Sequence, residues 1–218
     1  AGEIVGIAGL VGCGRVELLR AIYGADRRPH GRIRVRGREF RPRGPGASVR
    51  LGVGMVTGDR KTEGLVLPRS VHENVSMVRN RRLSLAPLRH RTDRRVTRGL
   101  MDRLHIQAAG ADVPVQSLSG GNQQKVVLAK WLAAKVNALL LDEPTRGVDV
   151  GAKVEIYRII SDLAESGVSI VVSSSENPEL LGICDRILVM FRGRMVAELH
   201  PSHTTEKEVV ALATGSRG

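Results

Sequence analysis

Apolar residues in this chain of 218 residues follow two alternating patterns. Short continuous runs predict buried strands at residues 3–8, 53–57, 138–141 and 168–172. Helix-spaced apolar residues predict the helices that separate them, at residues 16–23, 127–132 and 154–163. Strands that alternate with helices favour an α/β fold with a mostly parallel sheet, flanking helices and ligand sites at the carboxyl ends of the strands.

Other segments follow different patterns. Residues 32–40 alternate apolar and charged side chains, which predicts an exposed hairpin in a small antiparallel β layer, and residues 187–199 predict a closing hairpin. Residues 70–115 are polar, basic and interrupted by prolines, so they favour short surface helices in a helical lobe. Thr205 and Glu208 have the spacing of a capping box that begins a final helix.

This organisation predicts one domain with its core at residues 1–69 and 116–218 and its helical lobe at about residues 70–115. The hydrophobic share of 42% includes only 2% aromatic residues, so the core is expected to be aliphatic. The chain opens at Ala1, directly before an apolar strand, and we therefore expect it to be a piece of a longer protein.

The sequence also limits where the protein works. No apolar run approaches the roughly 20 residues that cross a bilayer, so a soluble or peripheral protein is expected. Cys13 and Cys184 form neither a metal-binding spacing nor a disulfide framework, which favours a reducing cytosol.

The net charge is +12, and arginines are concentrated between residues 27 and 50 and between residues 79 and 98. Basic surfaces attract phosphates, nucleic acid or an anionic membrane face. A solvated arginine-rich face is the simpler interpretation. Because aromatic residues that could stack on bases are scarce, no specific binding of nucleic acid is expected.

A glycine-rich loop between the first predicted strand and helix is a candidate phosphate-binding loop, with backbone N–H groups directed at the ligand. A full P-loop (Walker A) continues with Lys and then Ser or Thr, but this chain has Arg15 and Val16. Arginine can still pair with a phosphate, whereas valine has no hydroxyl for Mg²⁺. A glycine turn kept only for packing is the alternative. The loop consists of Gly9, Leu10, Val11, Gly12, Cys13 and Gly14.

Two further motifs carry candidate chemistry. Asp142 and Glu143 end a predicted buried strand, where the first carboxylate could hold Mg²⁺ through water and the second could orient an attacking water. Upstream of them, a hydroxyl, two glycines and a helix start form an anion cradle that could hold a γ-phosphate. This cradle is Ser119, Gly120 and Gly121, followed by Asn122.

In this order, the glycine loop, Leu118-Ser119-Gly120-Gly121 and Asp142-Glu143-Pro144-Thr145 resemble a P-loop ABC ATPase domain over essentially the whole chain. Residues 122–125, 59–61 and 146–153 are similar to the carbohydrate-importer branch, and within it to the second of two fused ATPase halves. The resemblance implies ATP and Mg²⁺ as cofactors. It implies three partners: a second ATPase domain fused upstream, membrane permease subunits, and indirectly an external (periplasmic or extracellular) sugar-binding protein.

The resemblance also assigns roles to residues. Two such domains meet head to tail, so Ser119, Gly120 and Gly121 would contact ATP held by the partner half, while the glycine loop, Asp142 and Glu143 would face this half's own ATP. Asp149 resembles the loop residue through which paired domains sense each other, although an N-cap role is the alternative.

This sequence departs from the family at its own ATP site. Besides Arg15 and Val16, Gly58 replaces the usual switch Gln, and Ser175 replaces the usual switch His. Together these changes should remove most of the electrostatic stabilisation of phosphoryl transfer. We therefore expect slow or no hydrolysis at this site, in a domain that works at the cytoplasmic face of the bacterial membrane and serves monosaccharide import.

Two other functions remain open at this point. One is a regulatory or interaction domain that binds nucleotide without transport, for which the positive charge would allow association with nucleic acid. The other is a self-sufficient ATPase homodimer, which would carry Arg15 and Val16 in both of its sites.

Overall fold

The computed structural model describes residues 1–26, 31–35, 37–82 and 90–216. The chain divides into two compact units. One unit, the sheet unit, contains Ala1–Met55, Asn137–Pro144 and Ile160–Gly218. The other, the helical unit, contains Val56–Val136 and Thr145–Ile159.

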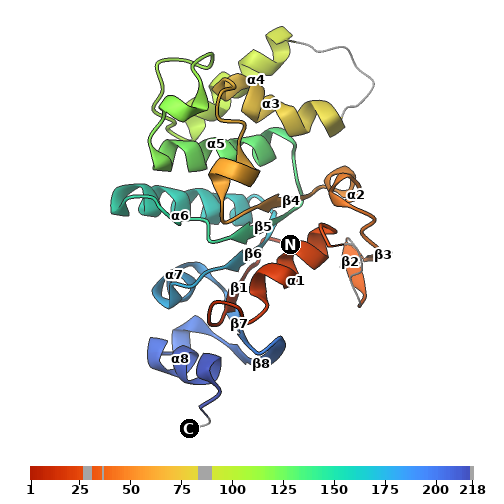
Figure 1. Cartoon of the computed structure of the whole chain (residues 1–218), viewed down its shortest axis with the longest axis vertical. Coiled ribbons are helices and arrows are strands. Elements are labelled where there is room, and N and C mark those ends of the chain that lie inside the picture. Colours follow the sequence, from red (N-terminus) through yellow and green to blue (C-terminus); the bar gives the residue numbers. More distant parts are fainter. Residues whose placement is uncertain (27–30, 36, 83–89, 217–218) are drawn as a thin grey trace. The chain divides into compact units, whose positions relative to one another are not determined.

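The six-stranded sheet has the order β4-β5-β6-β1-β7-β8 (Figure 1). β5, β6, β1 and β7 pair in parallel, and β8 pairs antiparallel with β7. A separate antiparallel pair consists of β2 (Ile33–Val35) and β3 (Arg38–Phe40). The strands of the large sheet are β1 (Ile4–Ala8), β4 (Val53–Val56), β5 (Ala138–Asp142), β6 (Ser169–Ser173), β7 (Arg186–Phe191) and β8 (Arg194–Leu199).

The helices of the sheet unit are set by glycine and proline at their ends. α1 (Arg15–Tyr23) begins after Gly14 and ends at Gly24, both with positive φ. One sheet face is covered by an aliphatic cluster in which Leu19 of α1 packs with strand residues such as Leu140. The other helices are α2 (Pro45–Leu51), α7 (Asn177–Ile183), the 3₁₀ turn η3 (Pro201–His203) and α8 (Glu206–Thr214).

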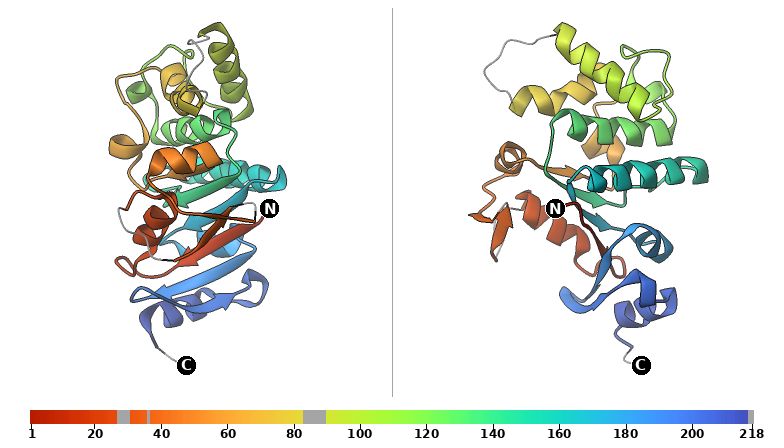
Figure 2. Two further views of the ribbon diagram at one scale, coloured as in Figure 1. Left: turned by 90° about the vertical axis from the view of Figure 1, so that its right-hand side faces the viewer. Right: turned by 180° about the vertical axis from the view of Figure 1, so that it is seen from behind.

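Three helices pack together in the helical unit, as Figure 2 shows. α3 (Val71–Arg82) and α4 (His90–Arg103) are joined by an ion pair of Arg79 Nη1 with Asp93 Oδ1 at 2.7 Å. Both contact α5 (Gly120–Ala133), which is buried along most of its length. The unit also holds the π-helical turn η1 (Arg60–Gly64), the 3₁₀ turn η2 (Val115–Ser117) and residues 150–159 of α6 (Val150–Glu165).

The α/β fold with a mostly parallel sheet and a small antiparallel layer is confirmed, as is the capping of α8, where Thr205 Oγ1 accepts from the N–H of Glu208. The sequence patterns did not predict α2 or α7, which have only seven residues each. The proposed lobe at residues 70–115 lies within the helical unit, although its residues 83–89 are outside the described residues.

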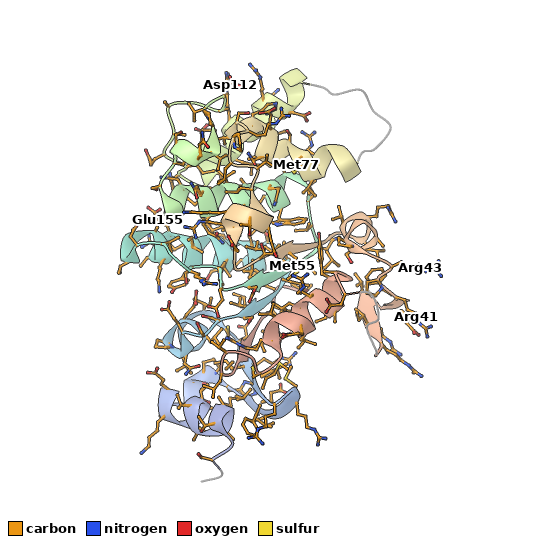
Figure 3. All side chains as sticks on the ribbon, viewed as in Figure 1. Arg41, Arg43, Met55, Met77, Asp112 and Glu155 are labelled. Carbon is orange, nitrogen blue, oxygen red and sulfur yellow. The ribbon has the colours of Figure 1, made fainter. Side chains whose placement is uncertain are left out.

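Exposed positions hold many of the arginines. Arg41 and Arg43 point away from the ribbon in Figure 3, and Glu39 Oε1 lies 3.7 Å from Arg41 Nε. Such weakly paired, exposed guanidinium groups are typical of a solvated face. Among the described residues, no helix combines the length and the apolar character that crossing a membrane requires.

Candidate functional site

The glycine loop follows β1 in the sheet unit and leads directly into α1. Gly9, Gly12 and Gly14 all have positive φ, a conformation that glycine adopts at little cost. A Cβ at Gly9 would lie 2.6 Å from the carbonyl oxygen of Met190, whereas a Cβ at Gly12 would meet nothing within 4 Å. The loop is therefore packed at its first glycine and open at its second, which leaves room for a ligand beside the start of α1.

Arg15 does not extend from this loop into solvent. Its side chain is only 5% exposed, and its guanidinium donates through Nη1 to the carbonyl oxygen of Ser174 and through Nη2 to Glu143 Oε1 at 3.3 Å. Next to it, the apolar side chain of Val16 is 41% exposed. The cation that the sequence offered to a phosphate is thus directed toward the strand ends instead.

Glu143 directly follows β5 and has a φ of +45°, which is unusual for a residue with a side chain. Its N–H donates to the carbonyl oxygen of Ser173 at 2.8 Å, which holds it beside the end of β6. Its Oε2 accepts a hydrogen bond from Ser175 Oγ at 3.1 Å, and its Oε1 faces Arg15. Both carboxylate oxygens are therefore engaged by this chain's own side chains.

These residues fit a phosphate group better than they fit Mg²⁺. The open loop and the amino end of α1 can accept an anion, because helix N–H groups there point outward. Mg²⁺ prefers several oxygen ligands. Asp142 offers a buried carboxylate, but Val16 offers no oxygen and Glu143 is already paired. Within the described ranges, no cluster of three or more acidic, His or Cys side chains could hold a metal ion.

The start of α5 in the helical unit is arranged differently. Ser119 is the N-cap, and its Oγ accepts from the N–H of Asn122 at 3.4 Å and from Asn122 Nδ2 at 3.0 Å. Asn122 Oδ1 in turn accepts from the N–H of Gln107 at 2.8 Å. Ser119 is exposed, so the amino end of a helix of 14 residues opens to solvent. A hydroxyl and free helix N–H groups form a suitable cradle for an anion.

Asp149 lies beside this helix start but points to its own helix. Its Oδ1 accepts from the N–H of Ala152 at 2.9 Å, so it caps α6. A Cβ at Gly121 would lie 2.5 Å from the Cβ of Ala152, which shows how closely α5 and the beginning of α6 pack. The structure thus shows the N-cap interaction of Asp149, which stays exposed at the loop, and its role in sensing a paired domain stays a prediction.

The sequence-predicted site residues fall into one group in each unit. The sheet unit brings together the glycine loop, Arg15, Val16, Asp142, Glu143 and Ser175. The helical unit brings together Ser119, Gly120, Gly121, Asn122 and Asp149.

Sequence reasoning missed two contacts. The pairing of Arg15 with Glu143 joins residues 128 positions apart, and no local pattern announces it. The other is the role of Arg60, which donates to the carbonyl oxygens of Arg146 and Gly147.

Comparison with known proteins identifies the family. A family model described as "ABC transporter" matches residues 1–146. The chain belongs to the ABC transporter family. ATP bound with Mg²⁺ is the ligand of ABC ATPase domains in general.

Curated relatives of this ABC domain are named for sugar import. It is 49% identical over 214 residues to the "Ribose import ATP-binding protein RbsA" of Chelativorans sp. (strain BNC1), covering 98% of this chain and 42% of the relative. Its identity to the protein of the same name in Bacillus subtilis (strain 168) is 44%, covering 100% of this chain and 44% of the relative. The chain therefore spans less than half the length of these relatives.

Solved ABC structures share the fold. The dimeric post-hydrolysis structure of the ATP-binding cassette MJ0796 bound to ADP and Pi has a TM-score of 0.79 at 22% identity, over 92% of this chain and 86% of that one. The structure of cbiO1 from Clostridium perfringens, part of the ABC transporter complex cbiONQ, has a TM-score of 0.78 at 25% identity, over 97% and 82% of the two chains.

Proposed function

We propose that this ABC domain is the second, degenerate ATPase half of a bacterial importer for ribose or a related monosaccharide. It supplies the start of α5 to an ATP molecule held by a partner ATPase domain, and its own phosphate loop contributes little hydrolysis. The observation that carries the proposal is the pairing of Glu143 with Arg15 and Ser175, set against the open helix start at Ser119. The names of the curated relatives support the solute class.

The contacts of Glu143 support slow hydrolysis at the domain's own site. A carboxylate that orients an attacking water must direct a lone pair at that water, and each hydrogen bond that it accepts from the protein leaves fewer lone pairs for that task. Here one oxygen receives a buried guanidinium and the other a serine hydroxyl. Loss of even one preorganised group at a reaction centre costs about a hundredfold to a thousandfold in rate. With Lys and the P-loop hydroxyl also replaced, the site suits nucleotide binding without turnover.

The start of α5 supports the contribution in trans. Gly120 is half-exposed and Ser119 is exposed, so a phosphate carried by another domain could reach the helix N–H groups. The curated relatives are more than twice as long as this chain, which leaves room for another domain of the same size. We therefore propose that the partner is a second ATPase domain with an intact Lys-Ser/Thr loop, fused upstream.

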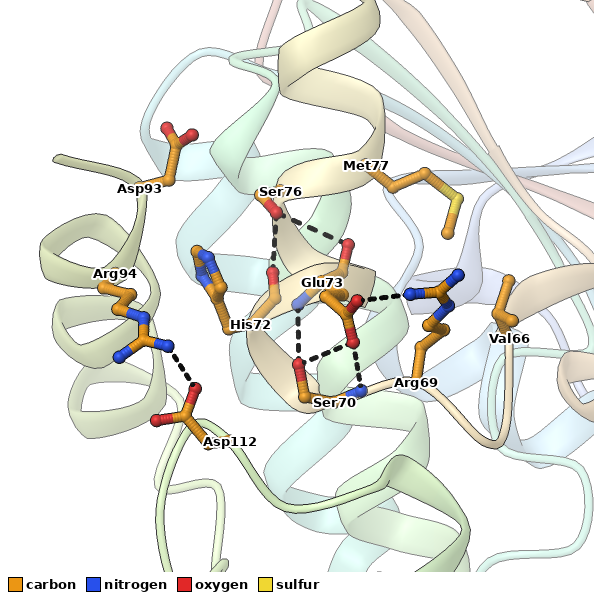
Figure 4. Close-up of a pocket in the computed structure, with 10 residues that line it drawn as sticks. All are labelled: Val66, Arg69, Ser70, His72, Glu73, Ser76, Met77, Asp93, Arg94 and Asp112. Atoms are coloured by element: carbon orange, nitrogen blue, oxygen red, sulfur yellow. Dashed lines mark hydrogen bonds and ion pairs between the residues drawn. The ribbon is translucent and has the colours of Figure 1, made fainter. Parts of the chain in front are cut away.

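A cavity of about 770 Å³ in the helical unit supports contact with a membrane subunit (Figure 4). The exposed side chains of Val66 and Met77 form an apolar part of its wall. Two ion pairs also line it, Arg69 with Glu73 at 2.7 Å and Arg94 with Asp112 at 3.1 Å. Most of the other lining residues are polar or charged, so the cavity offers both apolar contact and hydrogen bonds to a short helix of a partner protein. Together with residues 58–67, it is our proposed docking surface for the permease, and we propose that the domain works at the cytoplasmic face of the membrane.

The decisive experiment compares the two groups of residues in one protein. The full ATPase, with its competent first half, should lose at least about a hundredfold in ATP hydrolysis when Gly120 is replaced by Ala, because the added Cβ would lie 2.9 Å from the carbonyl oxygen of Gly147 and displace the helix start from the phosphate. Glu143→Gln in this half should leave the rate within about twofold, since its carboxylate takes no part. Gly99→Ala is the matched control, because a Cβ there meets nothing within 4 Å.

Two outcomes would contradict the proposal. A loss of hydrolysis in Glu143→Gln as large as that in Gly120→Ala would show that this half's own site turns over. An unchanged rate in Gly120→Ala, with wild-type stability, would show that the helix start contacts no nucleotide.

A further inference from the structure

The segment Asp59–Gly64 is a short turn fixed at both ends. Asp59 Oδ1 accepts from the N–H groups of Lys61 at 3.0 Å and Thr62 at 3.2 Å. Hydrogen bonding from the Thr62 side chain, and then from its N–H, lowers the pKa of Asp59. At the other end, the carbonyl oxygen of Gly64 accepts from Lys130 Nζ of α5 at 2.6 Å. The turn between them is a π-helix, a rare form that occurs frequently at functional sites.

Arg60 reaches from this turn to the loop before α6. Its Nη1 donates to the carbonyl oxygen of Arg146 at 2.6 Å, and its Nη2 donates to that of Gly147 at 3.0 Å. Burial lowers the pKa of Arg60, yet guanidinium groups stay charged in proteins, so the two bonds are charge-assisted. Gly147 has a φ of +67°, and Asp149 caps α6 two residues later. The guanidinium thereby fixes the loop that presents Asp149.

The same guanidinium lies against the start of α5. A Cβ at Gly120 would lie 2.7 Å from Arg60 Nη2 and 2.9 Å from the carbonyl oxygen of Gly147. Three segments therefore meet where only a glycine leaves enough space: the turn at Asp59–Gly64, the loop at 146–149 and the first residue of α5. All three belong to the helical unit.

We infer that Arg60 is a positioning residue that transmits movement of the turn Asp59–Gly64 to Gly120 and to the loop of Asp149. This inference rests on the proposed function, in which the turn contacts the permease and Gly120 contacts the partner's ATP. Only an arginine serves this role, because its planar fork gives two divergent donors for two successive carbonyls, whereas lysine gives a single point charge. A push on the turn shifts the guanidinium, and the guanidinium carries the loop and the helix start with it.

The test uses the assembled transporter and the same ATPase without its permease, and measures kcat and KM for ATP in both. Wild type should hydrolyse ATP faster with the permease. In Arg60→Lys and Arg60→Gln we expect this stimulation to fall to less than about twofold, while KM for ATP and the melting temperature stay near wild type. A residue with only a structural role would change the melting temperature and leave the stimulation ratio intact. Arg158→Gln is the matched control, because it removes an exposed arginine of the same unit that lies outside the proposed docking surface.

Failure of this inference can be distinguished from failure of the proposed function. If both Arg60 variants keep the wild-type stimulation while Gly120→Ala abolishes hydrolysis, the helix start acts in trans but Arg60 does not couple it, and the inference is wrong. If Gly120→Ala also leaves hydrolysis unchanged, the proposed function itself fails. Should Arg60→Gln unfold, Arg60→Lys preserves the charge and the aliphatic stem and decides the matter.

Discussion

The glycine loop of the sheet unit and the start of α5 in the helical unit both place glycines at the amino end of a helix, but each has a different cationic neighbour. Beside the glycine loop, the Arg15 guanidinium turns inward and pairs with Glu143. Beside Gly120, the Arg60 guanidinium donates to the backbone carbonyl oxygens of Arg146 and Gly147 in its own unit. In the first region the Glu143 carboxylate is paired with a cation, whereas in the second the helix begins at an exposed Ser119 and a half-exposed Gly120.

This difference shows how a domain can keep its fold after losing a reaction centre. The Arg15 side chain is buried and the Glu143 side chain is 19% exposed, and a buried charge without a counter-charge is costly, so the pairing of the two compensates both charges. The start of α5 has no buried carboxylate to satisfy, and its glycines are constrained by close packing instead. Variants that disturb the packing at the start of α5, or the ion pair beside the glycine loop, test this comparison.

The largest expected effect is steric, at the start of α5. In the full ATPase, Gly121→Ala should lower the hydrolysis rate by two to three orders of magnitude, about 3 to 4 kcal/mol, because the helix start must move. The added Cβ would lie 2.5 Å from the Cβ of Ala152. Steady-state ATPase assays give the rate.

The rescue variant for that prediction is Gly121→Ala combined with Ala152→Gly, which removes the opposing methyl group. It should recover at least about tenfold of the lost rate. The new glycine at position 152 should lower the free energy of unfolding by roughly 1 kcal/mol. An equal loss in the single and double variants would mean that Gly121 acts through the ligand and not through α6.

The next effect concerns a buried cation that has a carbonyl oxygen as its acceptor. Burial lowers the pKa of Lys130 to about 8, while the unfolded chain keeps that proton up to about 10.5. The unfolded state binds more protons in this window, so the free energy of unfolding should rise as the pH increases from about 8 to 10.5, by about 3 kcal/mol at most. Urea unfolding of wild type and Lys130→Met across this range measures the difference.

Lys130→Met should lack that rise, because it has no proton to release. Lys61→Met removes an exposed lysine of the same unit and should keep the wild-type slope. A Lys130→Met curve parallel to wild type throughout the window would show that the ammonium is better solvated than its burial indicates.

The third effect concerns the ion pair of the glycine loop. Arg15→Met should lower the free energy of unfolding by about 2 kcal/mol, because Glu143 keeps a charge with only the Ser175 hydroxyl beside it. Adding Glu143→Gln should restore at least about 1 kcal/mol, a coupling that chemical denaturation of the four variants measures. Arg20→Met on the same helix is the control, since Arg20 and Asp26 are 3.7 Å apart and largely exposed. If the changes in the free energy of unfolding caused by Arg15→Met and Glu143→Gln simply add, the two side chains do not stabilise each other and the prediction is wrong.

The sequence predicted the elements well where the pattern was long or specific, and poorly where the decisive contact was distant. The strands at β1, β5 and β6 and the helix α5 follow from continuous apolar runs and from the Ser119 cap. The inward turn of Arg15 could not be predicted, because its choice between a phosphate and Glu143 depends on residues that folding brings together. For Arg60, the motif at residues 59–61 pointed to a family, but not to the carbonyl oxygens that its guanidinium reaches.

The smallest effect should come from rebuilding the metal ligand set of the glycine loop. Val16→Thr combined with Arg15→Lys supplies the missing hydroxyl and a phosphate-binding point charge, so ATP affinity in the presence of Mg²⁺ should rise about tenfold. EDTA should remove that gain, while it should change the affinity of wild type by less than about threefold, since Val16 offers no oxygen. Titration of the chain with a fluorescent ATP analogue measures both values. Val11→Thr is the control, because it adds a hydroxyl at a position that is 90% exposed on the same loop. If wild type already binds ATP only with Mg²⁺, then Asp142 and water hold the ion without a hydroxyl at position 16. The glycine loop would then keep a working nucleotide site, as the start of α5 is proposed to do.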